Sequence, residues 1–209
     1  MDKNLVQLYE SVTFDKHDTQ FQKGYHHRRR TEILLEILSL LKNRMLILDV
    51  GCGDGVQAFL MCNSGHYVIG VDVSPTRLRR AKTRANNVVF GLSEALPFRK
   101  GFFDLVYMGE LIEHLPNPSE CLSEVWRVLK KRGYLIIDMP SKSNIWDLIS
   151  SKAISFLRLK NQKSEEVFNW GLYTDRTHVH FYSMKELIQL VCKIGFRVLK
   201  IKGVCFLRY

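Results

Sequence analysis

The 209-residue sequence has few cysteines, no CxxC pair and no long apolar run. Its five cysteines are odd in number and widely separated, which excludes a disulfide framework or a zinc finger and favours a reducing compartment. No stretch approaches the roughly 18 apolar residues that span a bilayer. The first residues lack the apolar segment of a signal peptide, and no repeat is present. We therefore expect a cytoplasmic protein without a transmembrane segment.

Positive charge dominates the sequence, with 31 Lys and Arg residues against 21 Asp and Glu residues and a net charge of +10. Such a balance suits a partner that carries phosphates or an anionic membrane surface. The basic residues are nevertheless dispersed over four separate segments, 26–30, 77–84, 130–132 and 152–163. We favour the interpretation that they are solvated surfaces, so nucleic acid is the less favoured partner.

Short apolar runs alternate with amphipathic stretches from residue 46 onward, which is typical of a parallel sheet covered by helices on both faces. The sequence predicts an α/β fold of the Rossmann-like, doubly wound type, with a mainly parallel sheet of six to seven strands. A last strand after Ile201 forms either a short hairpin or an irregular edge. The other predicted strands are 46–50, 67–71, 87–91, 102–108, 134–139 and 197–201.

Helix ends are marked by capping residues. Ser74 followed by Pro75 predicts an N-cap and a first-turn proline. The segments 117–120 and 183–186 each predict a capping box, and Gly195 predicts the end of the last helix.

The chain is expected to form a single domain built from four segments. Residues 1–42 form an N-terminal helical cap, with an amphipathic helix over 31–42, and residues 43–140 form the cofactor-binding core. Residues 141–182 are an insertion that we interpret as a helical lid, the alternative being a packed insertion without a role. Residues 183–209 provide the C-terminal helix and strands.

A glycine-rich turn leaves the first strand and opens a helix. Gly51, Gly53 and Gly55 allow a sharp turn and a close approach of a ligand to the backbone. Val56 breaks the GxGxxG pattern of a pyrophosphate-binding turn. Asp49, just before the glycines, would repel a diphosphate but would suit a ligand with an ammonium group and a sulfonium.

A second acid follows the next predicted strand. Asp72 lies 21 residues after Gly51 (72 − 51), where a carboxylate is placed to accept both hydroxyl groups of a ribose. The alternative is a tight turn and an acidic helix cap without a ligand. The two motifs together favour a nucleoside cofactor.

At this point the sequence resembles the class I S-adenosylmethionine-dependent methyltransferases, and in particular the type 11 branch that includes the ubiquinone-biosynthesis O-methyltransferases. The resemblance runs from about residue 46 to residue 196. Its elements are 48–55 (LDVGCGDG), 70–75 (GVDVSP), 94–98 (EALPF), 103–106 (FDLV), 110–118 (ELIEHLPNP) and 129–134 (LKKRGY).

The resemblance implies that S-adenosylmethionine is the cofactor and S-adenosylhomocysteine the product. Methionine, ribose and adenine would each contact a different part of one pocket. The implied cofactor-binding residues are Asp49, Gly51, Cys52, Gly53, Asp72, Val73, Ser93, Glu94, Met108 and Glu110. Leu92 departs from the family, which commonly has an Asp there to receive the adenine amino group. We expect weaker cofactor affinity as a result.

Glu110, Glu113 and His114 share one helix face by their i, i+3 and i+4 spacing. Together with His178 or His180 they could bind a divalent ion, but we favour a packing and capping role and predict no metal. Because methyl transfer needs a base only for a protonated acceptor, the catalytic residue is hard to name. We select His114 and His178 as proton acceptors or substrate orienters.

The leading hypothesis is therefore a methyltransferase that acts on a small-molecule acceptor by direct displacement. Two alternatives stay open: methylation of RNA or of a phosphate-bearing lipid, and a non-catalytic S-adenosylmethionine-binding module.

Overall fold

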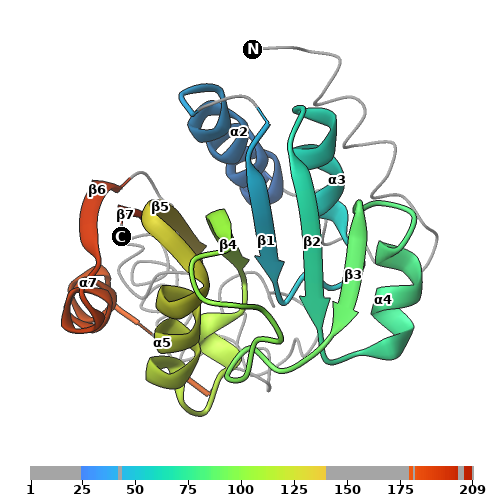
Figure 1. The fold of residues 1–209 in the computed structure, drawn as a ribbon. Helices are drawn as coiled ribbons and strands as arrows, with labels where there is room; N and C mark the ends of the chain where they lie inside the picture. The colour runs from blue at the N-terminus through green and yellow to red at the C-terminus, as the bar shows by residue number, and fades with distance from the viewer. Residues whose placement is uncertain (1–24, 42–43, 140–178, 181, 202–204, 209) are drawn as a thin grey trace, which may run out of the picture.

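The computed structural model describes residues 25–41, 44–139, 179–180, 182–201 and 205–208 (Figure 1). The described elements alternate between strands and helices along most of the chain. They are α2 (Tyr25–Ser39), β1 (Leu46–Val50), α3 (Val56–Asn63), β2 (Tyr67–Asp72), α4 (Pro75–Ala81), β3 (Asn87–Phe90), β4 (Phe103–Gly109), the 3₁₀ turn η1 (Ile112–His114), α5 (Pro118–Val128), β5 (Leu129–Asp138), α7 (Met184–Ile194), β6 (Arg197–Ile201) and β7 (Cys205–Arg208).

The strands form one sheet in the order β3-β2-β1-β4-β5-β7-β6. The pairs from β3 to β5 are parallel, whereas β7 is antiparallel to both β5 and β6. This arrangement confirms the predicted doubly wound fold, and β6 and β7 form the antiparallel pair that the sequence left open. The strand order reverses between β1 and β4, and a ligand binds in such a fold at the carboxyl ends of the strands beside that point.

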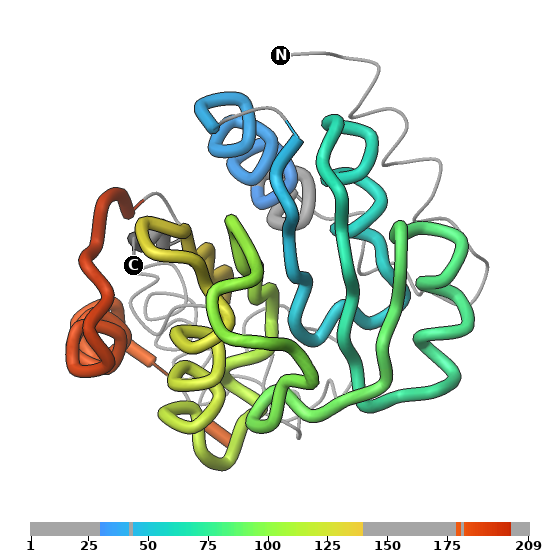
Figure 2. The backbone as a smooth tube through the Cα atoms, viewed as in Figure 1, coloured from blue at the N-terminus to red at the C-terminus, as the bar shows by residue number. Residues whose placement is uncertain are grey.

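Helices cover both faces of the sheet, as the chain path in Figure 2 shows. Alternate residues along each strand face opposite sides, so each face has its own hydrophobic core. On one side α5 and α7 pack over Leu48, Val106 and Leu135. On the other side α2 and α3 pack over Ile47 and Ile136, and α4 also lies on this second face.

The N-terminal helix differs from its prediction in its bounds. It spans Tyr25–Ser39 rather than 31–42. Its predicted apolar face is confirmed, since Ile33, Leu34, Ile37 and Leu38 are buried. Strand β5 likewise begins at Leu129 instead of residue 134, because the chain passes directly from α5 into a strand that pairs with Phe103.

All three predicted helix starts are confirmed, but only two of the predicted side-chain caps form. The Ser74 hydroxyl accepts a hydrogen bond from the Arg77 amide, and Ser183 and Glu186 form a complete capping box. The box predicted at 117–120 is wrong: the Asn117 side chain caps nothing. The Glu120 amide donates instead to the main-chain carbonyl of Asn117, at 3.1 Å, so the backbone already satisfies this donor.

Most of the predicted lid, 141–182, lies outside the described residues. Among the helices that the structure does describe, none has the length and apolar character needed to cross a membrane.

Candidate functional site

The glycine turn after β1 adopts a backbone that only glycine tolerates easily. Gly51 and Gly55 have φ values of 71° and 79°. Neither position has room for a side chain, because a Cβ at Gly51 would lie 2.9 Å from the Leu111 side chain and one at Gly55 would lie 2.9 Å from the Ala81 Cα. The turn is therefore held tightly against both η1 and α4.

The amides of this turn are already engaged within the protein. The amides of Gly51 and Cys52 donate to the Val71 carbonyl at 2.8 and 3.0 Å, and the Gly53 amide donates to Asp72 Oδ2 at 2.9 Å. A phosphate-binding turn presents free amides to its anion instead. The geometry thus supports the prediction that this turn does not bind a diphosphate.

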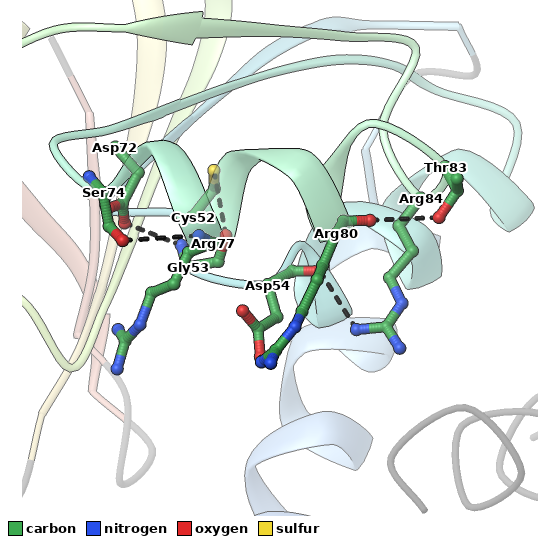
Figure 3. A network of polar contacts seen from close by, with 9 residues as sticks. All are labelled: Cys52, Gly53, Asp54, Asp72, Ser74, Arg77, Arg80, Thr83 and Arg84. Atoms are coloured by element: carbon green, nitrogen blue, oxygen red, sulfur yellow. Dashed lines mark hydrogen bonds and ion pairs between the residues drawn. The ribbon is translucent and has the colours of Figure 1, made fainter. Parts of the chain in front are cut away.

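Asp72 is the last residue of β2, and its carboxylate faces the glycine turn (Figure 3). Oδ2 accepts from the Gly53 amide, and Oδ1 accepts from the Ser74 amide at 2.8 Å. The side chain is fixed by both bonds and is nearly buried. Because a carboxylate has about four acceptor positions, each oxygen keeps one for a ligand hydroxyl group.

Asp49 lies on the same face of the sheet as Asp72 and is 2% exposed. Its Oδ2 atom has no hydrogen-bond partner. Burial and the neighbouring charge of Asp72 raise the pKa of Asp49 to about 7. A buried carboxyl group without a partner is costly unless a cationic or hydrogen-bond-donating group reaches it. The site therefore fits a ligand with positive charge at this point.

The ends of β2 and β3 expose apolar side chains beside Asp72. Val73 is 55% exposed and Leu92 is 57% exposed. The Ser93 hydroxyl donates to Glu94 Oε2 at 2.7 Å, so these two residues form one polar group at the same edge. An aromatic base suits such a surface, with apolar contacts on its faces and polar contacts at its rim.

Two predicted cofactor residues are turned into the protein interior. The Cys52 side chain packs against Gly70 of β2, and burial raises the pKa of its thiol well above the usual range. Met108 is fully buried in the core beneath α5. Any contact of these two residues with a ligand would thus be made by the backbone.

An ionic network lies at the ends of β4 and β5, and of its members only Glu110 was predicted as part of the site. Arg30 of α2 donates through Nε to Asp138 Oδ2, and its Nη1 lies 2.9 Å from Glu110 Oε1. The Tyr107 hydroxyl donates to the same Asp138 oxygen at 3.3 Å. Asp138 is 3% exposed, so Arg30 neutralises a buried carboxylate and ties α2 to the site.

The backbone after β4 is adapted to this network. A Cβ at Gly109 would lie 2.5 Å from the Tyr107 hydroxyl oxygen, so a larger residue would displace that ring. The next residue, Glu110, has the left-handed φ value of 50°, and its amide donates to the Asp138 carbonyl at 2.7 Å. Non-glycine residues in this conformation often mark functional sites.

Glu113 is 1% exposed, and neither of its carboxyl oxygens has a hydrogen-bond partner. Its main-chain carbonyl accepts from the amides of Val179 and His180 at 2.9 and 3.0 Å. Burial, opposed by its own backbone and reinforced by Glu110, raises the pKa of Glu113 to about 7. The turn η1 thus places a buried acid without a side-chain partner near the network.

Two of the candidate histidines, His114 and His180, lie in the described part of the chain. His114 ends η1, and its charge bears on Glu110. The His180 ring lies 3.3 Å from the Pro116 carbonyl oxygen. His178 lies outside the described residues. Within the part of the chain that the structure describes, no group of three or more His, Cys, Asp or Glu residues could hold a metal ion.

Comparisons with known proteins agree with this geometry. The model of a family described as a methyltransferase domain matches residues 48–137. The chain is 26% identical to the demethylmenaquinone methyltransferase of Lactiplantibacillus plantarum, across 93% of this chain and 88% of that protein. It is 27% identical to the 18S rRNA (guanine-N(7))-methyltransferase of Bos taurus, across 57% of this chain and 48% of that protein.

A solved structure shares the fold. The crystal structure of a SAM-dependent methyltransferase from Archaeoglobus fulgidus has a TM-score of 0.65 and 23% identity, across 87% of this chain and 75% of that one. Residues 48–137 therefore match a methyltransferase domain, and the described residues share the fold of a solved methyltransferase.

Proposed function

We propose that this chain transfers a methyl group from S-adenosylmethionine to a small-molecule acceptor by direct displacement and releases S-adenosylhomocysteine. The observation that carries the proposal is the pair of buried acids, Asp49 and Asp72, on the face of the sheet that adjoins the glycine turn. One acid has free acceptor positions for a ribose, and the other lacks the cation that its burial requires.

The proposed contacts follow from these positions. Asp72 accepts the two ribose hydroxyl groups, and Asp49 faces the positive charge of the methionine part. The turn at Gly51 and Gly53 allows close approach, and Val73 lies against the adenine. The remaining contacts, from side chain or backbone, come from Cys52, Ser93, Glu94, Met108 and Glu110.

S-adenosylmethionine, when bound, supplies an electrophilic methyl group that already carries a good leaving group. The protein's residues must then hold the acceptor in line with that methyl group and exclude water. Glu110, Glu113 and Arg30 lie at the ends of β4 and β5, where an acceptor would enter. His114 and His178 remain the proposed residues for orienting the acceptor or taking its proton.

Isothermal titration with S-adenosylhomocysteine tests the proposal. Asp72→Ala should weaken binding at least about tenfold, since two hydrogen bonds to a charged acceptor are lost. Glu120→Gln is the matched control, because this exposed acid lies on α5, on the other face of the sheet. Equal affinity in Asp72→Ala and the wild type would contradict the proposed site.

A further inference from the structure

The site as a whole, cofactor and acceptor sides together, is rich in acids although the whole chain is basic. Among the described residues, these acids form ion pairs with one arginine, Arg30, which is shared by Glu110 and Asp138. S-adenosylmethionine carries one net positive charge and can neutralise at most one acid more. The acids concerned are Asp49, Asp72, Glu110, Glu113 and Asp138.

Glu113 is an acid of this site whose burial and lack of partners are independent of the charge count. It is buried and unpartnered at both carboxyl oxygens, and the amides of Val179 and His180 hold its main chain in place. The charges of Arg30, Glu110 and Asp138 all bear on it. Tyr182 is also close to this acid, because burial and then the charges of Glu113 and Glu186 raise the pKa of Tyr182. The ionised form of an acid in such a place is stabilised by a ligand that donates hydrogen bonds or carries positive charge.

Resting on the function proposed above, we propose that the acceptor is an amine that enters as an ammonium ion, and that Glu113 takes its proton. An ammonium group supplies the charge and the donors that the site lacks. A phosphate, a carboxylate or a phenolate would instead meet several acids with one arginine among them, and like charges at an interface are strongly unfavourable.

The step balances in atoms and charge. The ammonium nitrogen gives one proton to the Glu113 carboxylate, which becomes a neutral acid. The freed nitrogen lone pair then forms a bond to the methyl carbon as the carbon–sulfur bond breaks, and that electron pair stays on sulfur. The products are a methylated ammonium ion and the neutral thioether. Burial of Glu113 favours its neutral form after the transfer.

Binding to protein saturated with S-adenosylhomocysteine tests the charge preference. The probes are matched sets of one ammonium ion, one carboxylate and one alcohol on the same short alkyl or aryl chain, such as phenethylamine, 3-phenylpropanoate and 2-phenylethanol. We expect at least one ammonium probe to bind about tenfold more tightly than its matched partners. Glu113→Gln should remove that preference, whereas Glu120→Gln, at an exposed position of α5, should keep it.

The outcomes separate the two proposals. If carboxylates or alcohols bind as tightly as their matched ammonium ions, or if no ammonium probe binds, the amine assignment is overturned. Retained affinity for S-adenosylhomocysteine in the same samples would leave the proposed function intact and would show that Glu113→Gln is folded. With the best amine as substrate, Glu113→Gln should lower kcat by about a hundredfold or more, and by more than His114→Gln does. The reverse order would assign the proton to His114.

Discussion

At the scale of single residues, the proposed site is defined by buried acids whose carboxyl oxygens lack hydrogen-bond partners. Asp49 and Glu113 are each almost fully buried, and each has carboxyl oxygen without a hydrogen bond. Such groups are rare in folded proteins because each costs about 1–3 kcal/mol. Under the proposed function, these acids would face the positively charged groups of the ligands.

Asp49 predicts a pH-dependent affinity for S-adenosylmethionine. Burial raises its pKa to about 7, so the acid is mostly neutral at lower pH and must ionise to face a cation. The affinity should therefore rise about tenfold between about pH 5.5 and pH 7. Isothermal titration across this range measures the effect. Asp49→Asn should bind weakly and almost independently of pH, and a wild type with no pH dependence would contradict the role of Asp49.

We predict that replacing Leu92 by an acid increases the affinity for the cofactor. Its side chain is 57% exposed beside Val73 and Ser93 and cannot accept a hydrogen bond from an adenine amino group. Leu92→Asp adds such an acceptor and should tighten S-adenosylhomocysteine binding about fivefold, the effect of one hydrogen bond. Leu40→Asp, at a leucine of similar exposure on the end of α2, should have no effect. Ordinary micromolar affinity without any gain in Leu92→Asp would refute this view of the adenine edge.

At the scale of elements, two of the ion pairs between α2 and the sheet differ in their burial. Arg30 reaches the buried Asp138, and Glu36 of the same helix pairs with Lys200 of β6 at 3.4 Å. Both side chains of the second pair are well exposed. Since burial decides what the loss of one partner costs, the two pairs offer a direct comparison.

Arg30→Gln should lower the free energy of unfolding by about 3 kcal/mol, because it leaves Asp138 charged, buried and unpaired. Lys200→Gln should lower it by less than about 1 kcal/mol. Urea unfolding of both variants measures the difference. Arg30→Gln combined with Asp138→Asn should recover part of the loss. Equal, small effects of the two single variants would show that the network does not hold α2.

The turn η1 predicts a pH dependence of stability through Glu113. Its pKa is raised from 4.5 to about 7 in the folded chain, so the folded state binds the proton more tightly than the unfolded state. The contribution of this proton is complete below about pH 4.5 and is lost as the pH rises through about 7, up to about 3 kcal/mol in all. Glu113→Gln should therefore become more stable relative to the wild type between about pH 5 and pH 8 in urea unfolding. A constant difference would contradict the buried, neutral acid.

The sequence predicted elements where a local rule decides the structure. The turn from Gly51 to Gly55 was readable because backbone sterics fix glycine there, and the caps at Ser74 and Ser183 were readable because each depends on neighbours three residues away. The Asn117 cap failed because the backbone supplied a competing acceptor.

The ionic network around Arg30 and Asp138 could not be predicted from the sequence, for a different reason. Arg30 and Asp138 are 108 residues apart, and only the packing of α2 on the sheet brings them together. In sequence, Arg30 belongs to a run of basic residues that has the appearance of a solvated surface. A signal existed in Tyr107 and Asp138, which are polar residues at the ends of otherwise apolar strands. Their shared face followed only once the strand register was known.

At the scale of the whole molecule, basic and acidic side chains both lie beside the glycine turn, and a Cβ at Gly53 would be 3.7 Å from the Arg77 guanidinium. Arg77, Arg80 and Arg84 project from one side of α4 and the segment after it (Figure 3). Arg80 pairs with the Asp54 carboxylate, and Arg84 donates to the Asp54 carbonyl. Other acids gather at the carboxyl ends of the strands, between α2 and η1. A basic exterior attracts anions at long range, so a preference for a cationic acceptor would have to come from the acids inside the site.

The central claim is that Asp72 binds the ribose of a sulfonium nucleoside held on the glycine turn. A crystal structure of the protein with S-adenosylhomocysteine tests it most directly. We expect both ribose hydroxyl groups within hydrogen-bond distance of the Asp72 carboxylate and the amino group of the ligand facing Asp49. Ligand density elsewhere, with the turn at Gly51 and Gly53 empty and Asp72 rotated away from it, would contradict the account.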